Sequence, residues 1–157
     1  MFPTKILLAT DGSQEASLAT EAAVELSNGT GSELHVVYVV PTILERPYPR
    51  AGTEERTAAF LEQKRLHGLR LLEVQAKHIE DLGGSVAASH YREGKPETEV
   101  VDLGKELDAG LIMTGGQKRP WFERIFGAGF SETVRRKADC PVLVVSRRGL
   151  QGTTVPR

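Results

Sequence analysis

Short apolar runs alternate along the chain with longer segments in which apolar residues recur at helical spacing. Each run is bounded by turn-forming residues, a pattern typical of buried strands. The predicted strands are Lys5–Thr10, Glu33–Val40, Ser85–Tyr91, Leu111–Thr114 and Pro141–Val145. Strands that alternate with helices form a parallel sheet whose two faces are both covered by helices. The sequence therefore predicts an α/β fold with a doubly wound, five-stranded parallel sheet.

The segments between these strands supply the predicted helices. In the first helix, Ser13 is the expected N-cap and Asn28-Gly29 the expected end. Proline is tolerated in the first turn of a helix, so Pro96 fits the start of the third. Helices are expected after Ser13, over about Glu54–Leu82, over Glu97–Leu107 and over Phe130–Lys137, with Thr42–Gly52 as a loop.

Composition and charge narrow the class of protein. The chain has 157 residues, 39% hydrophobic and 26% charged, which suits one globular domain. Lys and Arg total 20 against 21 Asp and Glu, so we expect binding neither to nucleic acid nor to an anionic membrane. The domain is expected over residues 1–147, followed by a flexible polar tail over 148–157.

Nothing in the sequence indicates export or a membrane span. Cys140 is the single cysteine, so no internal disulfide can form, which favours a reducing compartment. No apolar run approaches the roughly 18 residues that a membrane span needs. The first residues also lack the long apolar stretch of a signal peptide. We therefore expect a cytoplasmic location.

Two segments follow predicted strands and are candidates for ligand binding. Ala9–Ser13 follows the first strand and Thr114–Arg119 follows the fourth. Ligands of open parallel sheets bind outside the carboxyl ends of the strands, where the strand order reverses. Gly115 and Gly116 allow the backbone to approach a ligand closely, and Lys118 adds positive charge.

A phosphate-binding loop is one interpretation of the second segment. The predicted helix Phe130–Lys137 begins within the segment Gly127–Ser131. Helix N-termini bind phosphate through free N–H groups. The alternative is that Gly115-Gly116 is only a tight turn and that Gly127–Gly129 is only a hinge. The loop matches neither a Walker A motif nor G-x-G-x-x-G.

Asp11 allows two roles that can coexist. Its carboxylate can accept a hydrogen bond from a ribose hydroxyl, or it can cap the first helix together with Ser13. Trp121-Phe122, within the loop after Gly115, would either cover the pocket or anchor the loop onto the domain.

Neither a metal site nor a catalytic nucleophile is expected. No pair among the four histidines, His35, His67, His78 and His90, has metal-ligand spacing on one predicted face. Cys140 precedes Pro141 at a buried strand and is expected to serve packing. Ser13 lacks the G-x-S-x-G context of a nucleophilic serine.

These motifs together resemble the universal stress protein family over about Lys5 to Ser146. The segments that carry the resemblance are ILLATDGS, VVYVVP, REGKPETEVVDLGKELDAGLIMTG and SETVRRKADCPVLVV, in that order. The resemblance implies the strand order 3-2-1-4-5 and a homodimer paired through the last strand, Pro141–Ser146. It also implies a role in stress response or signalling. One branch of the family binds ATP through G-x2-G-x9-G-(S/T), and the other branch lacks this motif.

This chain combines matches to the ATP motif with departures from it. Gly115 stands at the first glycine, Lys118 at the second, Ala128 at the third and Gly129 at the Ser/Thr, while Ser131 keeps a hydroxyl. If position 128 needs a positive φ, Ala costs on the order of 1 kcal/mol. The missing hydroxyl costs about 1 kcal/mol. If they add, these losses weaken binding roughly thirtyfold. Lys118 could offset them by pairing with phosphates, or its side chain could fill the site instead.

The resemblance implies a set of contacts to the nucleotide. Asp11 would contact the ribose and Val39 would lie beside adenine. The full set is Ala9, Thr10, Asp11, Val39, Thr114, Gly115, Gln117, Lys118, Ala128, Gly129, Phe130 and Ser131. Magnesium would enter only with the phosphates of ATP.

Three functions remain open from the sequence. The first is a stress-response or signalling domain that binds an adenine nucleotide, ATP foremost, and is not an enzyme. The second is a dimeric interaction module without a nucleotide. The third is a slow ATP hydrolase, for which Glu123 is the only nearby candidate base. The sequence names no protein partner besides a second copy.

Overall fold

The structure is a computed structural model, and it describes residues 2–41, 53–116 and 129–146. Five parallel strands form one sheet in the order β3-β2-β1-β4-β5. The strands are β1 (Lys5–Ala9), β2 (Glu33–Pro41), β3 (Val86–Gly94), β4 (Leu111–Gly115) and β5 (Val142–Val145). Both the predicted fold class and the implied strand order are therefore confirmed.

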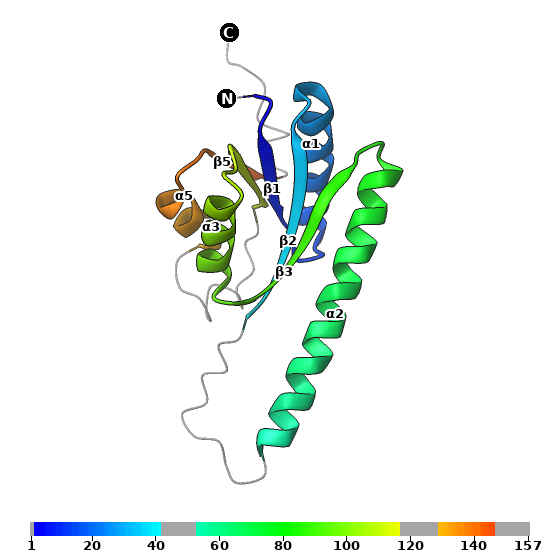
Figure 1. The fold of residues 1–157 in the computed structure, drawn as a ribbon, viewed down its shortest axis with the longest axis vertical. Coiled ribbons are helices and arrows are strands. Elements are labelled where there is room, and N and C mark those ends of the chain that lie inside the picture. The colour runs from blue at the N-terminus through cyan, green and yellow to red at the C-terminus, as the bar shows by residue number, and fades with distance from the viewer. Residues whose placement is uncertain (1, 42–52, 117–128, 147–157) are drawn as a thin grey trace.

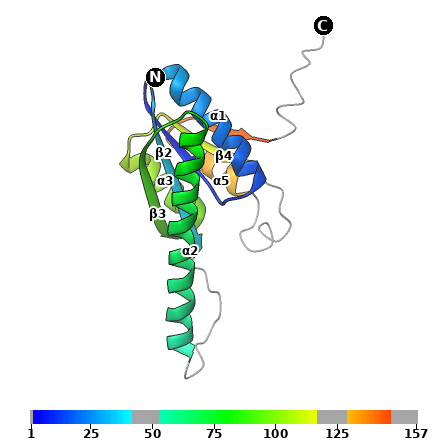
Figure 2. The same ribbon diagram turned by 90° about the vertical axis from the view of Figure 1, so that its right-hand side faces the viewer.

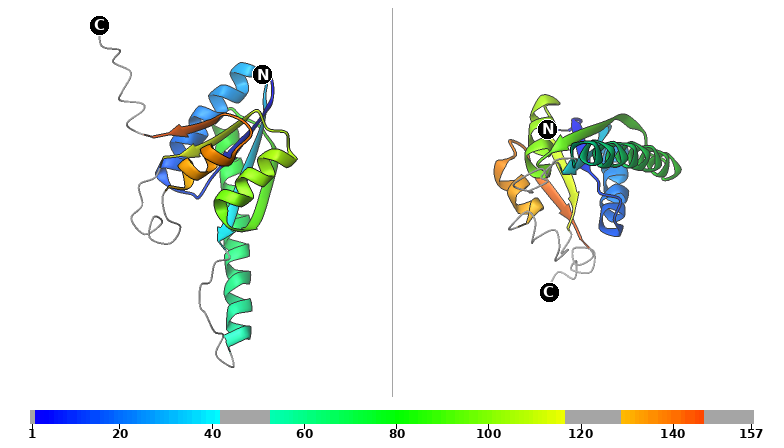
Figure 3. Two further views of the ribbon diagram at one scale, coloured as in Figure 1. Left: turned by 90° about the vertical axis from the view of Figure 1, so that its left-hand side faces the viewer. Right: turned by 90° about the horizontal axis from the view of Figure 1, so that it is seen from below.

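Helices cover both faces of this sheet (Figure 1, Figure 3). The helices are α1 (Gln14–Thr30), α2 (Thr53–Asp81), α3 (Pro96–Glu106) and α5 (Phe130–Lys137). Helices α1 and α2 pack on one face, and α3 and α5 pack on the other. The N-terminal half of α2 extends beyond the end of the sheet (Figure 2).

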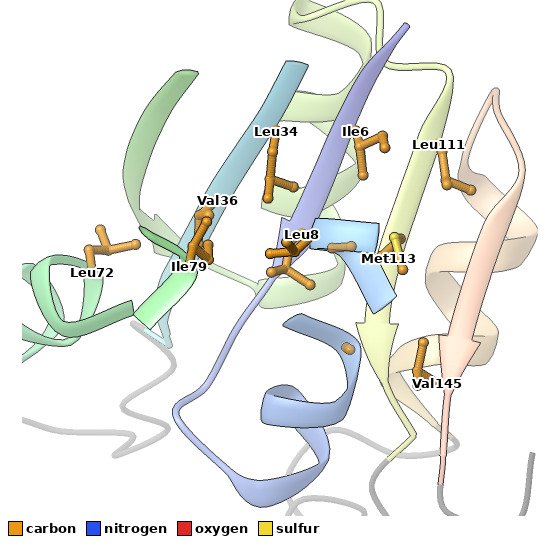
Figure 4. Close-up of a cluster of buried hydrophobic side chains, with 12 residues drawn as sticks. Ile6, Leu8, Leu34, Val36, Leu72, Ile79, Leu111, Met113 and Val145 are labelled. Carbon is orange, nitrogen blue, oxygen red and sulfur yellow. The ribbon is translucent and has the colours of Figure 1, made fainter. Parts of the chain in front are cut away.

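Alternation along the central strand divides the core between these two layers. Ile6 and Leu8 belong to the cluster beneath α1 and α2, together with Met113 of β4 (Figure 4). Leu7 points to the opposite face and joins the cluster beneath α3 and α5. All four side chains are fully buried. This two-sided burial explains why β1 is a continuous apolar run rather than an alternating one.

Some element ends differ from the prediction. Helix α1 continues past Asn28-Gly29 to Thr30, because Gly31 and not Gly29 adopts the left-handed cap conformation, with φ 70°. Strand β3 continues past Tyr91 because its pairing with β2 extends to Pro41↔Gly94. The predicted bounds of α5 are confirmed.

Several predictions fall on residues that the structure does not describe. They concern the loop Thr42–Gly52, the Trp121-Phe122 pair and the tail over 148–157, so the domain boundary stays a prediction. Among the described residues, no helix is both long enough and apolar enough to cross a membrane.

Candidate functional site at the carboxyl ends of the strands

The strand order reverses at β1, which lies in the middle of the sheet. The chain proceeds from β1 to β2 and β3 on one side, and β4 and β5 lie on the other. Ala9, the last residue of β1, pairs with Val37 of β2 and with Thr114 of β4. The turn after β1 and the end of β4 are therefore neighbours, where a ligand site is expected in an open parallel sheet.

Several hydrogen bonds hold the turn after β1 in place. The amide of Thr10 donates to the carbonyl of Val37 at 3.0 Å. The amide of Ser13 donates to Oδ1 of Asp11 at 2.9 Å, and Oγ of Ser13 accepts from the amide of Ala16 at 3.1 Å. Gly12 has φ 78°, a conformation that favours glycine. Asp11 and Ser13 thus share the capping of α1, one of the two predicted roles of Asp11.

Capping leaves Asp11 available for a second contact. The residue is exposed, and among the described residues only one of its carboxylate oxygens has a hydrogen-bond partner. Asp11 also acts on Tyr38. Burial, followed by the negative charge of Asp11, raises the pKa of the Tyr38 phenol. The second carboxylate oxygen can accept a hydrogen bond from a hydroxyl at the edge of the sheet.

A hydrogen bond joins the end of β4 to the first turn of α5. The hydroxyls of Thr114 and Ser131 lie 3.1 Å apart, and Thr114 is only 1% exposed. Gly129 precedes α5 with φ 36° and contributes no side chain to cap it. The start of α5 carries the partial positive charge of a helix N-terminus, so it is suited to an anion.

The two glycines after β4 have different environments. Gly115 pairs with Val145 of β5 as the last residue of its strand. Gly116 donates its amide to the carbonyl of Val145 at 2.8 Å. A Cβ added to Gly116 would lie 3.0 Å from Cβ of Ser146 and 3.1 Å from Cγ1 of Val144. Close packing against β5 therefore accounts for Gly116 without any ligand, although Gly115 belongs to β4 and the pair does not form the tight turn of the alternative interpretation.

An apolar surface lies beside these polar groups. Val39 belongs to the core cluster beneath α3 and α5, and Ala9 and Phe130 pack against that cluster. The structure thus brings together most of the predicted site on one edge of the sheet. The exceptions, Gln117, Lys118 and Ala128, lie outside the described residues, as does the candidate base Glu123.

Two of the four histidines, His35 and His90, lie side by side in the structure. Nδ1 of His35 and Nε2 of His90 lie 3.1 Å apart, and Nε2 of His35 lies 3.2 Å from Oε2 of Glu33. Burial, followed by electrostatic interaction with His35 and with Arg92, lowers the pKa of His90. The pair follows from the parallel alignment of β2 with β3, which sequence spacing alone does not give. Within the described residues, no group of three His, Cys, Asp or Glu could hold a metal ion.

Cys140 is half-buried and packs against the cluster beneath α3 and α5. Burial is the main cause that raises the pKa of its thiol. A raised pKa keeps the thiol protonated and unreactive at neutral pH. The predicted packing role of Cys140 is confirmed.

Comparisons with known proteins agree on one family. The sequence model of the universal stress protein family matches residues 3–146. A universal stress protein of Methanocaldococcus jannaschii is 29% identical over 143 residues, which cover 91% of this chain and 82% of that protein. A crystal structure from the family in Burkholderia pseudomallei is 27% identical and superimposes with a TM-score of 0.68, covering 91% of this chain and 96% of that one.

More distant solved proteins share the fold and were crystallised with ligands. A family protein of Arabidopsis thaliana with AMP bound has 18% identity and a TM-score of 0.65, covering 98% of both chains. A universal stress protein in complex with cAMP has 18% identity, a TM-score of 0.66 and coverage of 93% and 98%. Another from Archaeoglobus fulgidus, in complex with dAMP, has 21% identity, a TM-score of 0.60 and coverage of 92% and 99%.

Proposed function

This chain belongs to the universal stress protein family, and from that premise we propose that it binds an adenine nucleotide, ATP foremost, as a stress-response or signalling domain. The site is the edge of the sheet where β1 and β4 end. The observation that carries the proposal is the position of the Asp11 turn beside the Thr114–Ser131 hydrogen bond and the start of α5.

The chemistry of this edge supports each part of a nucleotide. Val39 and Ala9 offer an apolar surface for a base. The free carboxylate oxygen of Asp11 suits a ribose hydroxyl. Ser131 and the first turn of α5 suit phosphate. The ligands of the related structures, AMP, cAMP and dAMP, share these three parts. ATP adds two phosphates, and any magnesium would enter with them.

The backbone at Gly129 supports binding despite the departures from the ATP motif. By sequence alignment Gly129 stands where the motif has Ser or Thr, and Ala128 stands at its third glycine. A positive φ, which favours glycine, occurs at Gly129, where φ is 36°. A shift of one residue would therefore give Gly129 the role of the third glycine. Ser131 supplies a hydroxyl in the first turn of α5.

Calorimetric titration with ATP, AMP and cAMP tests the proposal. We expect a dissociation constant from micromolar to about 1 mM for at least one of them. Adenine nucleotide released from the denatured protein, identified by absorbance and mass spectrometry, would add support. No heat with any of the three at about 1 mM, with folded protein confirmed by circular dichroism, would refute the proposal.

We also propose that two copies pair through β5, which is a separate property from nucleotide binding. β5 is an edge strand of the sheet, and Leu143 and Val144 are 40% and 39% exposed. An exposed apolar edge strand is a surface for pairing with another chain. If titration shows no nucleotide, the chain would instead serve as a dimeric interaction module.

Light scattering at micromolar concentration tests the pairing. The wild-type chain is expected to be a dimer, and Val144→Lys is expected to be a monomer because a charge on the edge opposes pairing. Lys77→Ala, at an exposed position on α2, is the control and should remain dimeric. A wild-type monomer would refute this arrangement.

ATP hydrolysis is the third candidate function, and it can be measured at the same site. Phosphate release that survives Asp11→Ala unchanged would argue against an activity intrinsic to this edge.

A further inference from the structure

Apart from the edge of the sheet, a pocket lies on the α1 and α2 side, between the start of α1 and the middle of α2. Its volume is about 410 Å³, within the range typical of small-molecule sites. Its polar lining comes from Ser13, Ser17, His67, Arg70, Gln75 and His78. The two sites adjoin at the Asp11–Ser13 turn, but this lining shares no residue with the proposed adenine or phosphate contacts.

The charge of the lining is positive. Arg70 carries a full positive charge, and no carboxylate occurs among the described residues that line the pocket. The N-terminus of α1 adds a partial positive charge, because Ser13 is its N-cap. Asp11 precedes this lining, with one carboxylate oxygen held by the amide of Ser13. The pocket therefore favours an anion.

His78 also lines the pocket. Its Nε2 is buried, and within the described residues it is the one buried side-chain nitrogen or oxygen without a hydrogen-bond partner. Gln75 differs, because its Nε2 donates to Oγ1 of Thr20 at 2.6 Å.

The remaining donors set the kind of anion. Oγ of Ser13 accepts from the amide of Ala16 and keeps its own O–H to donate. Ser17, His67 and Arg70 can donate as well. A tetrahedral oxyanion offers acceptor oxygens in more directions than a planar carboxylate, and a guanidinium can bond two of them at once. Leu71 and Val74 complete the lining with apolar surface.

We propose that this pocket binds a small organic phosphate monoester, with its phosphate toward Arg70 and the start of α1 and its apolar part against Leu71 and Val74. The assignment does not depend on nucleotide binding at the other edge. The two sites nevertheless adjoin, since Gly12, which follows Asp11 in the turn after β1, lines this pocket.

Nuclear magnetic resonance of the histidine rings tests this site directly. The probes are inorganic phosphate and phenyl phosphate, titrated into the full chain while the ring signals of His67 and His78 are followed. We expect both signals to move, with a dissociation constant on the order of millimolar for inorganic phosphate and a lower one for phenyl phosphate. Equal affinity for the two probes would overturn the assignment to an organic phosphate.

Arg70→Gln separates a built site from loose attraction of anions. It should weaken both probes roughly tenfold, because it removes a charge-assisted hydrogen bond. Arg65→Gln is the matched control on the same helix, since Arg65 pairs with Glu62 and does not line the pocket. It should bind as the wild type does.

No movement of either ring signal at about 50 mM phosphate would overturn the proposal. So would equal movement in the wild type and Arg70→Gln.

Discussion

The amino and carboxyl ends of the sheet use the same kinds of residue in different ways. At the amino end, Oγ of Ser27 donates to the carbonyl of Ser32 at 2.7 Å, and the amide of Thr4 donates to Oγ of Ser32 at 3.0 Å. The hydroxyls of Thr30 and Ser32 lie 2.7 Å apart. At the carboxyl end, Asp11 is exposed and retains a free oxygen among the described residues.

This difference separates a structural network from a candidate binding site. Ser27 and Ser32 are 8% and 6% exposed, and their hydrogen bonds connect the end of α1 with the starts of β1 and β2. That network has its partners inside the protein. At the carboxyl end, Asp11 is exposed to solvent and can form a further hydrogen bond with a ligand. Mutations at the two ends should therefore separate stability from binding.

The largest effect on stability is expected from Ser32→Ala at the amino end. The change leaves the amide of Thr4 without its partner, which should lower the free energy of unfolding by about 2 kcal/mol. Urea denaturation measures it, with Ser89→Ala at an exposed position as the control. ATP affinity should not change. A large loss of affinity with the fold intact would contradict the division between the two ends.

Gly12→Ala should follow in size and should affect both properties. A side chain at φ 78° costs about 1–2 kcal/mol, and Leu71 must also move. The same turn carries Asp11, so ATP affinity should fall as well. Gly29→Ala is the matched control, because a Cβ there meets nothing within 4 Å. In that helical position it should raise stability by roughly 0.5–1 kcal/mol. Unchanged ATP affinity in Gly12→Ala would indicate that the turn is not part of the site.

Thr114→Val examines the link between β4 and α5. It should lower the free energy of unfolding by about 1 kcal/mol, because the hydrogen bond to Ser131 is lost while the volume is kept. ATP affinity should fall severalfold as the first turn of α5 loses its anchor. Calorimetry on Thr114→Val and Ser131→Ala measures this fall, and full affinity in both variants would exclude a role for the pair.

The smallest expected effect concerns pH and the His35–His90 pair. Burial, followed by electrostatic interaction with His35 and with Arg92, lowers the pKa of His90 in the folded chain. The unfolded chain, with an ordinary pKa of about 6.5, then binds a proton more readily. Stability from this group is complete above about pH 6.5 and declines as the pH falls below it.

Urea denaturation at about pH 5.5 and pH 7.5 measures this dependence. The loss of stability between the two conditions should be smaller in His90→Leu than in the wild type. An equal loss in both proteins would assign the pH dependence to other groups.

The sequence predicted the fold well and the site only in part. Buried parallel strands such as β1 are continuous apolar runs, so their positions follow from local pattern. The His35–His90 pair and the pocket beside Arg70 depend on which elements lie side by side, which no local pattern contains. Gly29 and Gly31 show the same limit, because either could end α1 and only the folded chain places Gly31 in the left-handed conformation.

The central claim is that the carboxyl end binds an adenine nucleotide through Asp11. Calorimetric titration of ATP into the wild type, Asp11→Ala and Ser32→Ala tests it most directly. We predict that Asp11→Ala weakens ATP binding by roughly tenfold or more, because it removes a charge-assisted hydrogen bond. Ser32→Ala should keep wild-type affinity. Equal affinity of the wild type and Asp11→Ala, or no binding by the folded wild type, would contradict the claim.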